Sequence, residues 1–289
     1  MSETRTPFEF LDEPAVISQF NYPNNITSIH PTGDGHAWIS DSQSKTIVLV
    51  DDKGTVERKV THHDGSIADI SIASNTKHIW FCCLNEKTIY EVPTTSDQPT
   101  KRFKTADEPF YLCVTKDGNV VVGSECKVTV YDGNGTVLHQ TTRDVSGVVS
   151  PASIAQCPVT GNVAIVNGEP TGSDTDNIKS WRSHVIVFDK TLDVKFRYKG
   201  EGIQNHEAAP THLFGPNSIS YDSFGNLAIA DYKTYTVELI NGSGQFIKTL
   251  HRNSREQGAI GIDTGNVLWT ELELDSGEWI IQLMKYYKH

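Results

Sequence analysis

The chain has 289 residues, of which 37% are hydrophobic, and a formal net charge of −11 at pH 7. No apolar run approaches the roughly 20 residues that a membrane-spanning helix needs, so we expect no membrane segment. The acidic balance argues against a general binder of polyanions, and a single all-β domain can reach this length.

The first part of the chain is expected to lie outside the repeated domain. Residues 1–14 read as an N-terminal extension, and residues 15–289 read as one domain. The run 1–7 has no basic region followed by an apolar segment, which a secretion signal would show, so a cytoplasmic location is expected. The run 15–20, Ala-Val-Ile-Ser-Gln-Phe, is an isolated strand-like segment ahead of the first repeat.

A repeating unit of four short strand-like runs, cut by Gly, Asn, Asp or Ser, then recurs along the chain. Its copies span 26–60, 67–103, 111–140, 152–198, 215–250 and 260–287. A period of about 40 residues with four strands per unit is typical of a β-propeller. The last copy lacks a fourth strand, which the run 15–20 can supply. The sequence therefore predicts an all-β, six-bladed β-propeller of four-stranded antiparallel blades, with the ring closed by an N-terminal strand.

Cysteine and histidine spacing gives no metal motif. The five cysteines form no CxxC pair, so we expect buried, reduced thiols and no zinc held through cysteine. His62 and His63 are the only adjacent histidines, and they are expected in a solvated crossing between blades. The cysteines are Cys82, Cys83, Cys113, Cys126 and Cys157.

The predicted topology puts two kinds of loop on one face. The turns between the second and third strands emerge beside the crossings from one blade to the next. These loops vary in length, whereas the turns on the other side are short, so the variable face is the expected working face. Two long excursions, 168–184 and 200–213, belong to the junction of blades four and five.

We expect this junction to bind a partner. The alternative is that both excursions are tolerated insertions without a role. The candidate binding residues are Trp181, Arg182, His184, His206, His212, Asn217, Tyr232 and Lys233.

A ring of oxygen-bearing side chains near the axis is a second candidate. Such a circle could hold Ca²⁺, which takes six to eight oxygen ligands. Asp and Asn after a strand also close turns through their own hydrogen bonds. We assign no metal ligand and no cofactor. The side chains concerned are Asn25, Asn217, Asp41, Asn85, Glu125, Asn167, Asp231 and Glu271.

Catalytic motifs are missing from the sequence. It contains no GxSxG, no HExxH and no phosphate-binding glycine loop, so we name no catalytic residue and expect a protein that is not an enzyme.

One repeat resembles a known family. The runs 214–232 and 244–250 are similar to an NHL repeat, with a Pro-Asn start, an Asp, a Gly-Asn turn, an apolar strand ending in Asp and a later Gly-x-Phe run. The whole chain resembles the C-terminal NHL propeller of tripartite-motif proteins, particularly the divergent invertebrate forms. That resemblance implies a binding platform for protein or RNA. The chain has no RING or B-box clusters.

Two other readings stay open beside the preferred one. Protein or peptide is the favoured partner, because an acidic loop face with Trp and Tyr suits a basic peptide. An RNA-binding NHL domain is the second reading, although the acidic loops disfavour it. The third is a metal-dependent hydrolase of the gluconolactonase and senescence-marker type, which shares the blade number but holds its ion with Glu, Asn and Asp. The innermost strand starts here carry two amides and no carboxylate.

Overall fold

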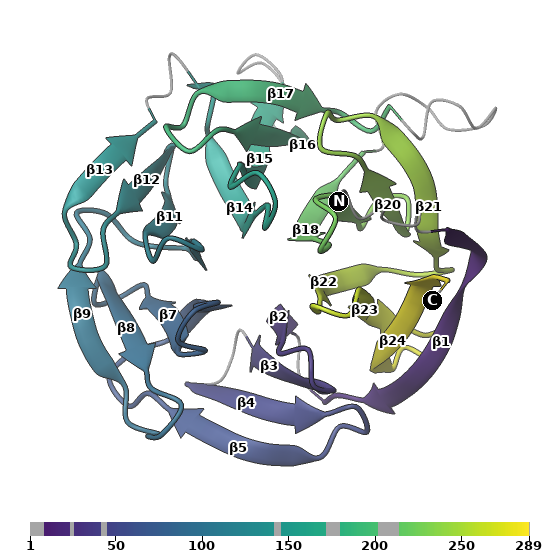
Figure 1. Ribbon diagram of the computed structural model, residues 1–289, viewed down its shortest axis with the longest axis horizontal. Helices are drawn as coiled ribbons and strands as arrows, with labels where there is room; N and C mark the ends of the chain where they lie inside the picture. The colour runs from purple at the N-terminus through teal and green to yellow at the C-terminus, as the bar shows by residue number, and fades with distance from the viewer. Residues whose placement is uncertain are drawn as a thin grey trace, which may run out of the picture.

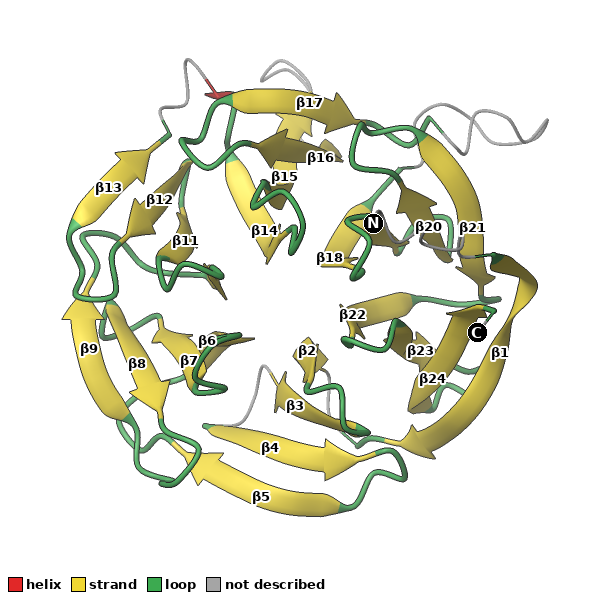
Figure 2. Ribbon diagram, in the orientation of Figure 1, coloured by secondary structure: helices red, strands yellow, loops and turns green. Residues whose placement is uncertain are grey.

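The fold is described from a computed structural model covering residues 9–23, 26–41, 45–141, 146–171, 180–201 and 214–288, with the backbone alone for 171, 180 and 181. Six antiparallel sheets of four strands stand around a central axis (Figure 1). Strands joined by turns account for almost all of the ring (Figure 2). This is the six-bladed β-propeller that the repeats predict. In these ranges no helix is long and apolar enough to span a membrane.

The strands follow the repeats closely. Blades one and two are β2 (Ile26–Pro31), β3 (His36–Asp41), β4 (Thr46–Asp51), β5 (Val56–Thr61), β6 (Ile67–Ile72), β7 (Ile79–Cys83), β8 (Thr88–Val92) and β9 (Thr100–Lys104). Blades three and four are β10 (Tyr111–Val114), β11 (Val120–Ser124), β12 (Lys127–Tyr131), β13 (Val137–Gln140), β14 (Ser150–Gln156), β15 (Val163–Thr171), β16 (Ser180–Phe188) and β17 (Val194–Tyr198). Blades five and six are β18 (Pro216–Tyr221), β19 (Leu227–Asp231), β20 (Thr236–Ile240), β21 (Phe246–Arg252), β22 (Gln257–Ile262), β23 (Val267–Glu273), β24 (Trp279–Tyr287) and β1 (Phe10–Asn21).

The N-terminal strand closes the ring, as predicted. β1 pairs antiparallel with β24, with Gln19 opposite Gln282, and lies outside it (Figure 1). The strand begins at Phe10, earlier than the run 15–20 that we expected. Phe10 is held there because its ring stacks on that of Tyr287, with centroids 4.7 Å apart.

Turn chemistry explains how each blade folds back on itself. In blade five, Oδ1 of Asp222 accepts the backbone N–H groups of Phe224 (2.9 Å) and Asn226 (2.8 Å). Gly225 in the same turn has φ +86°, a value that L side chains disfavour. The Ser-Phe-Gly-Asn segment therefore forms the tight turn that its composition predicts.

The hydrophobic core lies between neighbouring blades. One cluster, for example, joins Trp38 and Ile47 of blade one to Ile70 and Phe81 of blade two. The middle strands are buried on both sides, so they read as continuous apolar runs. The outermost strand β13 is exposed along its length. No blade buries its faces alone, because each hydrophobic cluster is shared by neighbouring blades.

A second set of contacts links the innermost strands around the axis. Oγ of Ser218 accepts the N–H of Ile260 at 3.0 Å, and Oγ of Ser71 accepts the N–H of Val114 at 3.0 Å. In each case a short polar side chain reaches the innermost strand of the next blade. The edges that face the channel are thus partly paired across the gaps between sheets.

Candidate binding face and central channel

Five blades share one buried polar position on the variable face. In each of these blades the pairing between the first and second strands is irregular near the start of the first strand. The second-strand residue beside this irregularity is at most 3% exposed. A shared backbone irregularity therefore fixes a common site near the channel mouth. The five residues are Asp41, Cys83, Asn167, Asp231 and Glu271.

Most of these side chains accept hydrogen bonds from backbone N–H groups. Oδ1 of Asn167 accepts the N–H of Val149 at 2.8 Å, and Oδ1 of Asp231 accepts the N–H of Gly215 at 3.1 Å. Such bonds fasten each crossing to its blade, which supports the turn-closing alternative over a calcium ring. Of the other residues considered for that ring, Asn85 and Glu125 are exposed turn residues, and Asn25 lies outside the described residues.

Burial strongly perturbs the carboxyl groups at this position. It raises the pKa of Glu271 to about 7, against the opposing effect of the N–H groups of Ile26 and Ala259. It also raises the pKa of Asp231. Near neutral pH Glu271 therefore carries less negative charge than the sequence count implies.

Three predicted binding residues lie on β16 of blade four, and the side chains of two of them, Arg182 and His184, are described. The Arg182 side chain is exposed, whereas His184 is 5% exposed. Nε2 of His184 lies 3.2 Å from Nη1 of Arg197, which donates to it if the imidazole is neutral. Burial lowers the pKa of His184, which favours that neutral form. His184 thus lies beneath the surface, and Arg182 is the one of the pair that a partner can reach.

Three further predicted residues gather at the start of blade five. Nζ of Lys233 lies 5.8 Å from the ring centroid of Tyr232, whose side chain is 37% exposed. Nδ2 of Asn217 donates to the carbonyl of Gln257 at 2.9 Å. Tyr232 and Lys233 share one turn of the variable face with a second tyrosine, Tyr235, which is also 37% exposed.

The side chains of the remaining predicted residues are not described. His206 and His212 lie outside the described residues, as do most of the two excursions, and only the backbone of Trp181 is described. That backbone pairs with Pro170 across β15 and β16.

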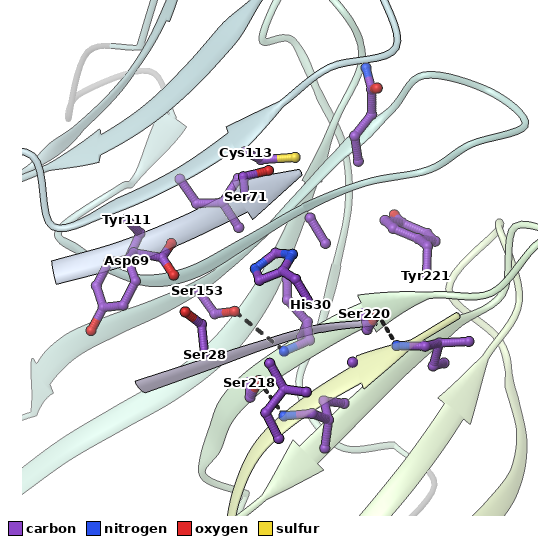
Figure 3. A pocket seen from close by; sticks show the side chains of 18 of the residues that line it. Ser28, His30, Asp69, Ser71, Tyr111, Cys113, Ser153, Ser218, Ser220 and Tyr221 are labelled. Atoms are coloured by element: carbon purple, nitrogen blue, oxygen red, sulfur yellow. Dashed lines mark hydrogen bonds between the residues drawn. The ribbon is translucent and has the colours of Figure 1, made fainter. Parts of the chain in front are cut away.

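The central channel forms a cavity of about 410 Å³ lined by all six innermost strands (Figure 3). Its lining extends to Lys116 and Pro158 in turns on the face opposite the variable one. Several of its hydroxyls already bond to neighbouring strands, including those of Ser71 and Ser218. The volume matches that of small-molecule sites.

Burial strongly shifts the pKa values of two titratable groups in this cavity. Burial raises the pKa of Asp69 to about 7, although its Oδ2 accepts the N–H of Leu112 at 2.9 Å. His30 is partly exposed where it lines the cavity, and burial lowers its pKa to about 4. Near pH 7 the channel therefore presents a neutral imidazole and a carboxyl close to half protonation.

No sequence motif marks Asp69, His30 or Tyr235 as a candidate functional residue. Asp69 and His30 lie inside innermost strands that read as ordinary alternating segments, so only the closed ring reveals that they share a cavity. The one feature of the sequence that could have marked them is a polar side chain within an otherwise apolar strand.

The expectation for His62 was wrong. Its neighbour His63 is exposed, but His62 is 4% exposed and packs against the rings of Phe81 and Tyr90, at centroid distances of 5.3 and 4.6 Å. The crossing folds over the blade because Gly65 permits close approach: a Cβ there would lie 2.3 Å from Sγ of Cys83.

The fold, the variable face and the lined channel define a six-bladed β-propeller. The chain is similar in structure to streptogramin B lyase, with a TM-score of 0.64 and 11% identity over 96% of this chain and 98% of that one. It is also similar to the hydrazine synthase of Kuenenia stuttgartiensis, with a TM-score of 0.58 and 11% identity over 93% and 95% of the two chains. At this identity the likeness concerns the fold. No protein-family model and no curated protein sequence matches the chain.

Proposed function

We propose that this propeller is a non-catalytic interaction module that binds a protein or peptide through its variable face. The observation that carries the proposal is the pair of exposed tyrosines, Tyr232 and Tyr235, on one turn of blade five. Tyrosine is enriched among residues that dominate binding energy. The resemblance of this blade to an NHL repeat supports the same role.

Backbone strain adds to the case for Tyr235. Its φ is +58°, a left-handed conformation that costs a bulky side chain about 1 to 2 kcal/mol. Lys87 has φ +49° at the corresponding place in blade two, so the turn geometry belongs to the scaffold. Folding therefore requires a left-handed residue here but not a tyrosine, and the exposed ring of Tyr235 is free to serve contact with a partner.

Charge points to a basic partner. A hollow of about 680 Å³ on the variable face, between blades two and three, is lined by Asp107, Glu108 and Glu125 together with Phe110. Lys127 pairs with Asp107, and Lys87 also lines the hollow, so three carboxylates outnumber two ammonium groups there. A peptide carrying Lys or Arg beside an aromatic or aliphatic residue has the complementary chemistry.

A peptide-display selection tests this proposal. The immobilised protein is expected to enrich basic peptides whose affinity, measured by fluorescence anisotropy, falls at least about tenfold in a Tyr232→Ala, Tyr235→Ala double variant. Val159→Ala is the matched control, because Val159 is exposed on the opposite face. Enrichment of acidic peptides, or equal binding by the double variant, would refute the proposal.

Binding of a small polar molecule in the channel is a second candidate. It is favoured by the cavity and the raised pKa of Asp69. Asp69 is the one carboxylate among the described lining residues, which is a poor donor set for a hard cation and does not fit the metal-dependent hydrolase. A thermal-shift screen of small polar compounds tests the idea, with hits expected to lose their effect in Asp69→Asn.

A further inference from the structure

We propose that His62, Cys83 and Glu86 form a binding site for one zinc ion on the variable face of blade two. Their ligand atoms all lie within 4.8 Å of one another, which makes them the one such group found among the residues whose placement is described. They come from separate places in the chain: the crossing from β5 to β6, the end of β7 and the turn before β8. A search for CxxC spacing cannot detect such a set.

The distances allow coordination after small side-chain movements. Zinc bonds of about 2.0 to 2.3 Å in a tetrahedron hold ligand atoms roughly 3.3 to 3.8 Å apart. Nε2 of His62 lies 3.6 Å from Oε2 of Glu86, within that range. The 4.8 Å limit on the remaining separations requires a shift of about 1 Å.

An unpartnered buried nitrogen points toward a missing ligand. Nε2 of His62 has no hydrogen-bond partner, because Oε2 of Glu86 at 3.6 Å is too distant for a hydrogen bond, although the residue is 4% exposed. A buried polar atom left unpaired is costly, and a metal bond would satisfy it. Phe81 and Tyr90 pack against the imidazole, and the Tyr90 hydroxyl donates to Oε2 of Glu86. Supporting contacts of this kind orient metal ligands.

Cys83 departs from its counterparts in the other blades. It occupies the shared buried position that Asp41, Asn167, Asp231 and Glu271 fill elsewhere, where oxygen atoms hold backbone amides. Blade two alone has sulfur there, beside an imidazole nitrogen. Sulfur and nitrogen donors select zinc over Mg²⁺ or Ca²⁺. A thiolate, a carboxylate and a neutral imidazole also balance the charge of Zn²⁺.

The site has a route to solvent and room for a further ligand. The Glu86 side chain is 24% exposed, while Cys83 is fully buried beneath Gly65. Three protein ligands leave a fourth tetrahedral position for water or a partner group. Asp64, exposed in the same crossing, adds negative charge near both His62 and Cys83.

Metal titration of the full chain, freed of any histidine tag and stripped with chelator, tests the site. We expect uptake of one Zn²⁺ per chain by calorimetry, and a thiolate-to-metal charge-transfer band when Co²⁺ replaces zinc. Cys83→Ala should abolish the band and weaken zinc binding by more than about 100-fold. Cys82→Ala, which removes the adjacent buried thiol, should keep both.

A second pair of variants guards against misfolding. Glu86→Gln alters a partly exposed side chain and should also weaken zinc binding, whereas Glu125→Gln, in the corresponding turn of blade three, should not. Circular dichroism confirms that each variant is folded. The proposal fails if the wild-type chain takes up no stoichiometric zinc, or if folded Cys83→Ala and Cys82→Ala bind it equally.

Discussion

The carboxylate of Glu271 accepts a hydrogen bond of 3.0 Å from the backbone N–H of Ile26, 245 residues earlier in the chain. Its other oxygen accepts the N–H of Ala259 at 3.2 Å. One side chain therefore bridges the joint where blade six meets blade one. The same joint is closed on its outer side by β1 and β24.

Glu271→Ala is expected to destabilise the fold by roughly 2 to 4 kcal/mol, because two buried amides lose their acceptor. Urea unfolding at pH 6, below the pKa of Glu271 of about 7, measures the loss. Glu278→Ala, an exposed change in the same blade, should stay within about 0.5 kcal/mol of wild type. Equal stability of the two variants would show that the bridge contributes nothing.

Deleting residues 1–21 should convert the ring into aggregates, because the edge of β24 loses its partner. A deletion of residues 1–8 alone keeps β1 and should leave the oligomeric state of the full chain unchanged. Size-exclusion chromatography with light scattering distinguishes the two results. A monomeric, cooperatively melting chain without β1 would mean that closure is dispensable.

Asp69→Asn should change how stability depends on pH. Burial raises the pKa of Asp69 from 3.8 to about 7. Between these values the folded protein keeps a proton that the unfolded chain loses, so this carboxyl's contribution is full below about pH 4 and is lost as the pH rises through about 7. The variant should gain on wild type by up to about 1.4 kcal/mol per pH unit in this window.

Urea midpoints at pH 5 and pH 8 provide the comparison. Asp117→Asn, an exposed change in a turn, is the control and should show the wild-type dependence. A constant difference between Asp69→Asn and wild type across the window would contradict the raised pKa.

Tyr235→Asn should stabilise the protein by about 0.5 to 1 kcal/mol, because asparagine tolerates the left-handed backbone that tyrosine resists. Lys87→Asn should stabilise it by a similar amount. Thermal and urea unfolding measure both changes. If Tyr235 serves a partner, only the first variant should also lose affinity for selected peptides. A destabilised Tyr235→Asn would show that the ring itself packs usefully in the fold.

The fold was predictable because its determinants are local and repeated. Turns such as the one at Asp222, with glycine at a positive φ, punctuate strands whose apolar runs reveal their burial. The missing last strand and the spare run 15–20 together predicted the closure. The early start at Phe10 was not visible, since its stacking on Tyr287 joins the two ends of the chain.

The candidate sites were harder to predict because they combine distant segments. Asp69 and His30 line the same cavity only because the six innermost strands close around it. The sequence predicted a solvent-exposed His62, but in the structure the crossing that carries it packs over Cys83. Tyr232 was identified because it lies directly after a recognisable strand, and it remains a predicted binding residue.

Sharing blade six between the two ends of the chain has a consequence for synthesis. The first strand leaves the ribosome long before β24 exists, so its pairing edge must wait while the other blades are made. Ring assembly can finish only after β24 has been synthesised. A chain interrupted before β24 would contain five complete blades but remain an open ring with an unpaired, aggregation-prone strand edge.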